Sequence, residues 1–412
     1  MKTIVCLVST QHVPNLLTVR AVNPGNLVLV VTEGMKKNVP WFLNALAAGG
    51  RDYSQNHEII GVERENSVDE VLTSLNEAYR KRPGDEWIIN VTGGTKPMSI
   101  GAYAFAKENG LKALYIVESD QNKAIDLSGG GPVALDHIVS TAEFLAGYGY
   151  DIRNGKDLDR QNRQAWELQG LGAMLTEQHE DPEIRAFLAS LQRLKEAKKR
   201  ESRRKWEKEG LILSGEEGLW IGNDPIRARI CREFRLRGED GALAGRLERH
   251  AAEFLTGRWL EYFIYGLLVP FVPESLTSLQ IGLAAGQPGP GESNEFDVSF
   301  MANQSLCIVE CKTGSQKQDV KGDAVLYKME AIKAGLGAIR VRAFLATTSP
   351  NVIDPGTKDT REALKNRANL YQCSIIHGGT LKHLASLYLA NDPSLHAKVA
   401  AVFGLKSRPG AS

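Results

Sequence analysis

The stretch EWIINVTGGTKPMSIGAY, residues 86–103, joins a short apolar run to a helical pattern through a loop rich in Thr and Gly. Pro97 stands near the first helical position, where the missing N–H of proline costs nothing. The backbone amides from Gly93 to Lys96 and the helix dipole would form an anion site. The spacing fits neither G-x-x-x-x-G-K-[ST] nor G-x-G-x-x-G. We therefore predict a strand, a tight turn and an anion-binding helix N-terminus; a purely structural tight turn is the alternative.

The same alternation of strand and helix extends over the first 150 residues. Other short apolar runs lie at 3–8, 27–32, 57–62 and 113–118, and helical patterns lie at 38–48, 68–80 and 97–109. Buried strands that alternate with helices indicate a parallel, doubly wound α/β sheet. Ligands of such sheets bind outside the carboxyl ends of the strands. The candidate ligand-binding loops are therefore 9–15, 32–36 and 92–96.

The composition is that of an ordinary soluble globular protein. The chain has 412 residues, of which 42% are apolar and 24% charged, so two or three domains are expected. It contains no run of about 18 apolar residues, which excludes a membrane span, and its N-terminus resembles a buried strand more than a signal peptide. The five cysteines form neither a disulfide framework nor a zinc pattern. We expect a cytoplasmic protein with no membrane partner.

We divide the chain into residues 1–150, a helical and β-hairpin linker region at 151–244, and a second α/β domain at 245–405. The expected hairpin is GLILSGEEGLWIGN, residues 210–223. The net charge of +1 gives no global signal for nucleic acid, but Arg193 to Lys208 holds nine Lys or Arg against three Glu. This run is either a solvated helical linker or a contributor to phosphate-backbone binding.

The strongest chemical signal lies in NEFDVSF (294–300) and SLCIVECKT (305–313), which have side chains of alternating character. So few residues separate them that they must form an antiparallel hairpin. With Asn303-Gln304 as a two-residue turn, Asp297 lies directly opposite Glu310, with Cβ atoms roughly 4.5–5.5 Å apart. A slip of one residue would mix the apolar face of one strand with the polar face of the other.

Two carboxylates so close together raise each other's pKa unless a cation stands between them. Oxygen ligands of this kind suit Mg²⁺ or Mn²⁺. Lys312 follows Glu310 on the same face, where its ammonium could orient an attacking water and stabilise charge on a phosphate. The alternative is a surface hairpin held by salt bridges.

This arrangement resembles the PD-(D/E)xK nuclease superfamily, whose core order is helix, three strands, helix, strand. The resemblance implies that Asp297 and Glu310 bind the metal, with the Cys311 carbonyl as a third ligand, and that Lys312 is the catalytic lysine. Family members often add a carboxylate from the first core helix, expected here at 245–268. Glu261 is the matching catalytic candidate, with an ordinary helix-surface glutamate as the alternative. Phe296 stands where the family usually has proline.

Together with CLVSTQHVPNLLTV (6–19) and NVTGGTKPMSIGAY (90–103), this C-terminal half resembles the CARF-domain effector nucleases of type III CRISPR defence. The resemblance implies an N-terminal Rossmann-like CARF sensor, a helical linker and a restriction-endonuclease-like domain. In that family two CARF domains pair as a homodimer and hold one cyclic oligoadenylate, usually cyclic tetra-adenylate, which reorganises the nuclease half. Each protomer then needs only a short cradle.

The implied contacts of the cyclic oligoadenylate are Ser9, Thr10, Gln11, Thr92, Gly93, Gly94, Thr95, Lys96 and Met98. Met98 and Met35 would cover an adenine, although buried methionines more often belong to a core. His12 could act on the cyclic ligand, but a lone loop histidine is more often inert.

The leading hypothesis is a metal-dependent endonuclease that cuts DNA or RNA, with little base readout, when a cyclic oligoadenylate binds. One alternative is a repair or restriction endonuclease that needs no cyclic nucleotide. Another is a ligand-controlled binding protein with an inactive nuclease fold; the intact Asp297, Glu310 and Lys312 argue against it.

Overall fold

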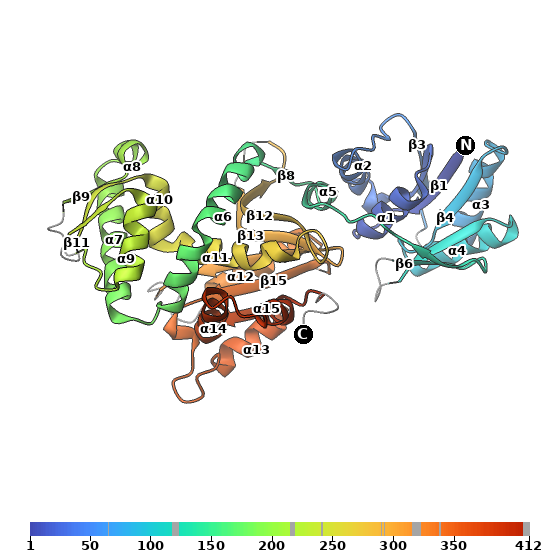
Figure 1. The fold of residues 1–412 in the computed structure, drawn as a ribbon. Coiled ribbons are helices and arrows are strands. Elements are labelled where there is room, and N and C mark those ends of the chain that lie inside the picture. Colours follow the sequence, from blue (N-terminus) through green and yellow to red (C-terminus); the bar gives the residue numbers. More distant parts are fainter. Residues whose placement is uncertain are drawn as a thin grey trace.

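The computed structural model describes residues 1–64, 66–117, 123–214, 219–239, 242–289, 291, 293–314, 323–337 and 339–406. The described chain forms three units in a row (Figure 1). An N-terminal sheet domain lies at one end, a small unit of helices and short strands lies at the other, and the C-terminal sheet domain lies between them. No helix among the described residues is long and apolar enough to cross a membrane.

The N-terminal domain is built on a seven-stranded sheet with the order β3-β2-β1-β4-β5-β6-β7. Its strands are β1 (Lys2–Leu7), β2 (Asn26–Thr32), β3 (His57–Val62), β4 (Glu86–Asn90), β5 (Lys112–Ile116), β6 (Lys123–Asp126) and β7 (Gly131–Ala134). The first five strands are parallel, which confirms the predicted parallel α/β core. β6 and β7 add an antiparallel edge that we did not predict.

Helices cover both faces of this sheet. They are α1 (Val13–Val22), α2 (Asn38–Ala48), α3 (Val68–Arg80) and α4 (Lys96–Glu108), with a short 3-10 turn, η1 (Glu33–Met35), before α2. On one face Ile4 packs in a cluster with Leu16 of α1 and Phe42 of α2. On the other face its neighbour Val5 packs in a cluster with Leu75 of α3. Both faces are buried because successive side chains of a strand point in opposite directions.

The C-terminal domain has a six-stranded sheet with the order β16-β15-β14-β13-β12-β8. Its strands are β8 (Asp151–Ile152), β12 (Thr277–Gly286), β13 (Asn294–Ala302), β14 (Ser305–Lys312), β15 (Val341–Thr347) and β16 (Cys373–His377). Its helical elements are α6 (Gly155–Glu177), α10 (Arg249–Glu253), the π-helix η2 (Phe254–Arg258), α11 (Trp259–Leu268), η3 (Val269–Phe271), α12 (Asp323–Gly335), η4 (Pro350–Val352), α13 (Glu362–Leu370), α14 (Gly378–Leu389) and α15 (Leu395–Phe403). The order α11, three strands, α12, β15 is the predicted helix, three strands, helix, strand.

Two hydrophobic clusters hold these helices on the sheet. α6, α11, α14 and α15 cover the face that carries Val309, and α12 and α13 cover the face that carries Leu345. The helix predicted at 245–268 begins later, at Arg249, because residues 242–247 form a strand. β8 pairs with β12 and α6 packs on α11, so residues 151–177 of the predicted linker region are built into the C-terminal sheet. The other domain limits stay a prediction.

The small unit contains α7 (Pro182–Glu201), α8 (Arg203–Glu209), α9 (Asp224–Phe234) and a sheet with the order β10-β11-β9. Its strands are β9 (Leu211–Ser214), β10 (Arg237–Glu239) and β11 (Ala242–Leu247). The hairpin predicted at 210–223 is wrong, because β9 pairs with β11 and Trp220 bridges to Ala242 on the same strand. The buried side chains of β9 pack against apolar side chains that are distant in sequence. The expected turn lies outside the described residues.

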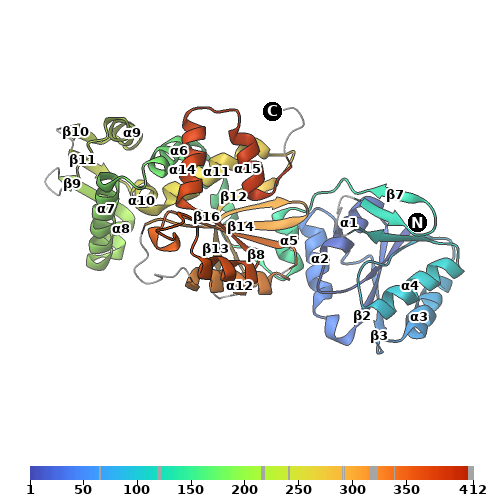
Figure 2. The ribbon, with the colours of Figure 1, turned by 90° about the horizontal axis from the view of Figure 1, so that it is seen from below.

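The two sheet domains meet around α5 (Thr141–Gly147), which lies between them in the view from below (Figure 2). Gln304, in the β13–β14 turn, is 2% exposed. Its Oε1 accepts a hydrogen bond from Val139 N–H at 3.0 Å, and its Nε2 donates to the His137 carbonyl at 2.8 Å. Gln11, in the loop after β1, donates from Nε2 to the Gly337 carbonyl at 2.9 Å. The interface therefore contains specific polar contacts besides apolar packing.

Candidate active site and anion-binding loops

The hairpin of β13 and β14 has the predicted register. Asn303 and Gln304 have φ angles of 50° and 56°, as a two-residue hairpin turn with left-handed central residues requires. The ladder runs from Ala302↔Ser305 to Val298↔Val309. Beyond it, the Cys311 N–H donates to Asp297 Oδ2 at 2.7 Å, so a side chain replaces a backbone acceptor. This contact fixes the Asp297 carboxylate beside the carboxyl end of β14.

Lys312 brings its ammonium to both carboxylates. Its Nζ lies 2.6 Å from Glu310 Oε1 and 3.8 Å from Asp297 Oδ2. Glu310 is 2% exposed, so this charge interaction is shielded from water. Burial and the Glu310 charge raise the pKa of Asp297 to about 6. Burial lowers the pKa of Lys312, but the two carboxylates outweigh it and the net pKa is raised. The predicted trio is thus brought together as one charge cluster around the buried Glu310.

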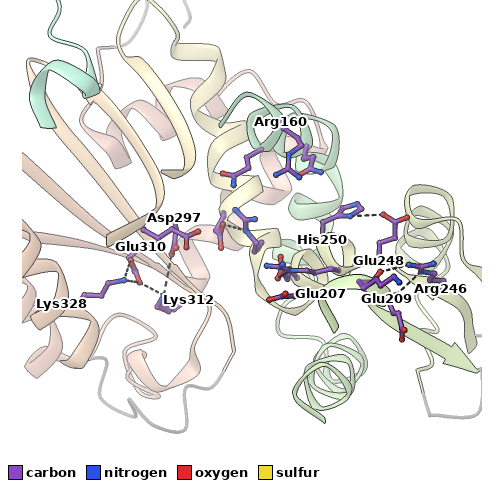
Figure 3. A pocket seen from close by; sticks show the side chains of 18 residues that line it. Arg160, Glu207, Glu209, Arg246, Glu248, His250, Asp297, Glu310, Lys312 and Lys328 are labelled. Atoms are coloured by element: carbon purple, nitrogen blue, oxygen red, sulfur yellow. Dashed lines mark hydrogen bonds and ion pairs between the residues drawn. The ribbon is translucent and has the colours of Figure 1, made fainter. Parts of the chain in front are cut away.

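Lys328 of α12 is a second ammonium at this site that we did not predict. Its Nζ lies 3.0 Å from Oε1 and 3.3 Å from Oε2 of Glu310 (Figure 3). Glu310 is therefore shared by two lysines, one from its own strand and one from the following helix. The sequence shows Lys328 only as a lysine on a helix that follows the hairpin, a pattern too common to indicate an active-site residue.

Glu261 of α11 is mostly buried, with 13% of its side chain exposed, and is paired with Arg258. Arg258 Nε lies 2.9 Å from Glu261 Oε2, and Arg258 directly precedes α11 at the end of the π-helix η2. Burial raises the pKa of Glu261 to about 8; Arg258 lowers it, and the nearby Asp297 raises it further. The alternative that Glu261 is an ordinary surface glutamate is therefore wrong. Its carboxyl points into the same charged region as Asp297 but is occupied by Arg258.

The donor atoms fit a hard divalent cation. Asp297 and Glu310 offer carboxylate oxygens, which Mg²⁺ and Mn²⁺ prefer, and such ions usually keep several waters. The mutual repulsion that raises the pKa of Asp297 is relieved by a positive charge, the role that Lys312 fills here. Within the described residues no three His, Cys, Asp or Glu side chains converge as a metal site.

At the other end of the molecule, the loops after β1 and β4 lie side by side because these strands are parallel neighbours. A Cβ on Gly93 would lie 2.2 Å from the Leu7 carbonyl, and Gly94 has a φ of +73°. Both positions therefore require glycine. Thr95 caps α4, accepting a hydrogen bond from Met98 N–H. Lys96 is exposed and has no ion pair with any described residue. These features support the anion-binding helix N-terminus.

Several loop residues that were predicted to contact a ligand instead make hydrogen bonds or apolar contacts within the protein. The Thr92 hydroxyl donates to Asn90 Oδ1 at 2.8 Å and accepts from Ile116 N–H at 2.9 Å, so it is structural. Met98 is 1% exposed and belongs to the core, contrary to the prediction that it covers an adenine. Gln11 points to the C-terminal domain. The side chains of Thr92, Met98 and Gln11 are therefore not candidate ligand contacts.

The remaining loop residues stay open to a ligand. Ser9 Oγ contacts the Gln11 backbone at 3.2 Å and Thr10 is exposed. Met35 accepts a contact from Asn38 and is only partly buried. His12 is buried against Phe42 and Tyr148, and burial lowers its pKa to about 4. Its position in the core favours the inert alternative for this histidine.

Family models of known proteins match both sheet domains. Residues 3–137 match the Card1 CARF domain, and residues 248–371 match the Card1-like endonuclease domain. The chain carries a CARF domain and a Card1-like endonuclease domain. This confirms the architecture expected from the two sets of motifs. A search of curated proteins finds no match.

Solved structures share the fold of both domains. Can2 from Sulfobacillus thermosulfidooxidans, solved in complex with cyclic tetra-adenylate, is 20% identical, with a TM-score of 0.67 over 94% of this chain and 99% of Can2. VC1899 from Vibrio cholerae is 16% identical, with a TM-score of 0.73 over 96% of this chain and 98% of its own. A type III CRISPR defence DNA nuclease activated by cyclic oligoadenylate is 18% identical, with a TM-score of 0.51 over 89% of this chain and 51% of its own. At these identities the likeness establishes the fold.

In the endonuclease domain the carboxylates open into a large cavity of about 870 Å³. Asp297, Glu310, Lys312 and Lys328 line one end of it, and side chains of the small unit line the other (Figure 3). All the described residues that line it are charged, histidine or glutamine. The active-site candidates are therefore accessible from solvent although Glu310 itself is buried.

Proposed function

We propose that this protein is a metal-dependent endonuclease that cuts DNA or RNA when cyclic oligoadenylate, most simply cyclic tetra-adenylate, binds its CARF domain in type III CRISPR defence in the cytoplasm. The observation that supports it most is the partly buried cluster of Asp297, Glu310 and Lys312, which opens into a charged cavity. A carboxylate pair with a lysine on one hairpin face is the donor set of the PD-(D/E)xK nucleases. The association of this cluster with a CARF domain supports its control by a cyclic nucleotide.

In the proposed reaction, Asp297, Glu310 and the Cys311 carbonyl would hold Mg²⁺ or Mn²⁺. The bound ion would act as a Lewis acid on the scissile phosphate and lower the pKa of a water. Lys312 would leave the carboxylates, orient that water and stabilise charge on the phosphate oxygens. Glu261 would assist from α11 by accepting a proton or hydrogen-bonding the water, once its pairing with Arg258 loosens.

The activator would lie between two CARF domains of a homodimer. The exposed Lys96, the amides of the Gly93-Gly94 turn and the N-terminus of α4 provide half of a phosphate cradle on each protomer. Ser9 and Thr10 lie in the neighbouring loop and would contact phosphate or ribose, and Thr95 lies between the glycines and the helix. Such a short loop cannot enclose a ligand alone, which favours a shared site.

The contacts of Gln11 and Gln304 offer a route for the signal. Gln11 joins the loop after β1 to Gly337, just before β15, and Gln304 joins the turn of the catalytic hairpin to the chain that leaves the CARF sheet. A displacement of the loop would therefore shift the strands that carry or flank Glu310. Both contacts are hydrogen bonds between the domains, so a movement at one end would displace the other end.

One assay tests this function. The full chain is incubated with Mn²⁺ and with plasmid, single-stranded DNA or RNA, with and without cyclic tetra-adenylate. We expect cleavage that requires both the metal and the activator. Cleavage that ignores the activator would favour the repair or restriction endonuclease. Activator binding without any metal-dependent cleavage would favour the ligand-controlled binding protein.

A further inference from the structure

The cavity has a second wall that the catalytic motif does not explain. Beyond the carboxylates it is bounded by α8, the end of β11 and α10, through Lys208, Arg246, Arg249 and His250. Figure 3 labels Arg246 and His250 on this side. Pockets for small molecules are lined mainly by apolar and aromatic side chains, whereas none of the described residues that line this cavity is of that kind. A volume of about 870 Å³ with such a lining suits part of a long, charged molecule.

Two backbone carbonyls hold the Arg246 guanidinium in place, and among the described residues it has no carboxylate partner. Its Nε donates to the Glu209 carbonyl at 3.2 Å, and its Nη2 donates to the Lys208 carbonyl at 3.1 Å. Carbonyl oxygens orient the guanidinium but do not neutralise it. Lys208 is exposed and, among the described residues, has no carboxylate partner. Two adjacent cations therefore face the cavity with their charge available.

Three carboxylates of the same wall are paired with other cations. Glu207 pairs with Arg203 at 3.1 Å, Glu209 with Lys198 at 3.7 Å, and Glu253 with Arg249 at 2.8 Å. Glu248 lies 3.5 Å from His250, which is a cation only when protonated. Because Glu207, Glu209 and Glu253 have cationic partners of their own, they do not cancel Lys208 and Arg246. At the metal end of the cavity, Asp297 and Glu310 pair with Lys312.

We propose that Lys208 and Arg246 bind the sugar–phosphate backbone of the nucleic-acid substrate beside the scissile phosphate. This rests on the proposed nuclease function and extends it to a substrate path. Arg246 lies across the cavity from Asp297 and Glu310 (Figure 3), and Lys208 lines the same cavity, so a strand bound to both cations would pass the carboxylates. Contacts of this kind carry affinity without base readout. The small unit is thus the second wall of the substrate cleft, and Lys208 is the part of the basic run 193–208 that faces it.

The test measures binding rather than cleavage. Full-length protein with Glu310→Gln is titrated, with cyclic tetra-adenylate present, into fluorescein-labelled single-stranded and duplex oligonucleotides between 50 and 200 mM KCl. The double variant Lys208→Ala/Arg246→Ala should weaken binding about 10-fold and reduce the slope of log K against log [salt] by about 1 to 2. Arg232→Ala is the matched control, an exposed arginine on α9 of the same unit that does not line the cavity; it should behave as the parent.

Melting curves of all variants check that the unit stays folded. In the cleavage-competent chain, the double variant should raise KM more than it lowers kcat, because uniform binding is lost. An unchanged affinity and salt slope in the double variant would overturn the substrate path while leaving cleavage by the parent intact. Parent protein that binds neither oligonucleotide would overturn it as well. Absence of metal-dependent cleavage, by contrast, would overturn the nuclease itself.

Discussion

The side-chain amide of Gln304 accepts the Val139 N–H at 3.0 Å, so the turn of the catalytic hairpin is tied to the chain that leaves the CARF sheet. The same side chain donates to the His137 carbonyl at 2.8 Å. Gln304→Ala leaves the buried Val139 N–H without this partner, at a cost of roughly 1–3 kcal/mol, and removes the part-buried bond to the His137 carbonyl as well. We expect it to uncouple the two domains more than it damages either one.

For Gln304→Ala we predict that the ratio of activated to basal cleavage falls at least about 5-fold. Because coupling of binding equilibria is reciprocal, substrate should also shift the affinity for cyclic tetra-adenylate less than in the parent, as calorimetry would measure. Asn303→Gly is the control, since it keeps the left-handed turn and the Gln304 side chain. An activation ratio equal to that of the parent would contradict this role.

Removal of the charge cluster should abolish cleavage. Glu310→Ala and Lys312→Ala are each expected to lower the activated rate at least about 100-fold, because one removes a metal ligand and the other a cation that stabilises the phosphate. Activated cleavage of a labelled oligonucleotide measures the effect. Glu362→Ala, an exposed acid at the start of α13, should cut at the parental rate. Cleavage by Glu310→Ala at the parental rate would show that the active site does not lie on this hairpin.

Lys328→Met should tighten metal binding. Lys328 and Lys312 both occupy Glu310 Oε1, at 3.0 and 2.6 Å, so they compete with a divalent cation for this carboxylate. Without Lys328 we expect Mn²⁺ to bind about 3- to 10-fold more tightly in calorimetry without substrate. Lys365→Met, an exposed lysine on α13, is the control. Weaker binding would show that Lys328 supports the metal site by positioning Glu310.

Metal binding should weaken as the pH falls through about 6. In the metal-free protein, burial and Glu310 raise the pKa of Asp297 to about 6, so the carboxyl is protonated below that pH and a metal must displace the proton. Below pH 6 each pH unit should cost up to about tenfold in Mn²⁺ affinity, with protons released on binding. Asp297→Asn removes this dependence along with a ligand. A pH-independent affinity from pH 7 to 5 would contradict the raised pKa.

The same shift affects stability, with the opposite sign to an ordinary salt-bridged aspartate. Because the pKa of Asp297 is raised in the folded state, the folded protein binds more protons than the unfolded chain between about 6 and the ordinary value of 3.8. The ionised Asp297 carboxylate therefore lowers the free energy of unfolding above pH 6. This destabilisation disappears as the pH falls to 3.8, because the carboxyl is then protonated in the folded protein. Metal-free Asp297→Asn should be more stable than the parent at pH 8 in urea unfolding, and the gain should shrink at pH 5.

Lys96→Ala should weaken activation without changing the chemistry. Lys96 is exposed beside the glycine turn, 200 residues from the catalytic hairpin in sequence. We expect the concentration of cyclic tetra-adenylate for half-activation to rise about 10-fold, while the rate at saturation stays that of the parent. Lys107→Ala, in the last turn of the same helix, is the control. A lower rate at saturating activator would indicate that Lys96 acts on the signal instead.

Much of the endonuclease site could be predicted from the sequence because a two-residue turn and a period-two pattern leave one register. Asn303-Gln304 and the alternation in β13 and β14 placed Asp297, Glu310 and Lys312 together, as the structure has them. Lys328 and Arg258 could not be predicted, since their contacts depend on how α12 and α11 pack on the sheet.

In the loops after β1 and β4, too, some features could be predicted from the sequence and others could not. The tight turn before α4 was predicted from the sequence, whereas the close approach of Gly93 to the Leu7 carbonyl and the inward use of Thr92, Met98 and Gln11 depend on partners far along the chain. The hairpin expected at 210–223 failed for this reason, because β9 pairs with β11 rather than with its neighbour.

The sequence by itself determined most elements of the two sheet domains and the register of the catalytic hairpin, since these follow from periodicity and turn chemistry, and its motifs resembled those of a CARF domain followed by an endonuclease domain. Only the tertiary structure decided that Lys208 and Arg246 face the carboxylates across one cavity and that Gln304 bonds to Val139. Those relationships join residues distant in sequence, and side-chain packing and pairing, which no local pattern encodes, select them.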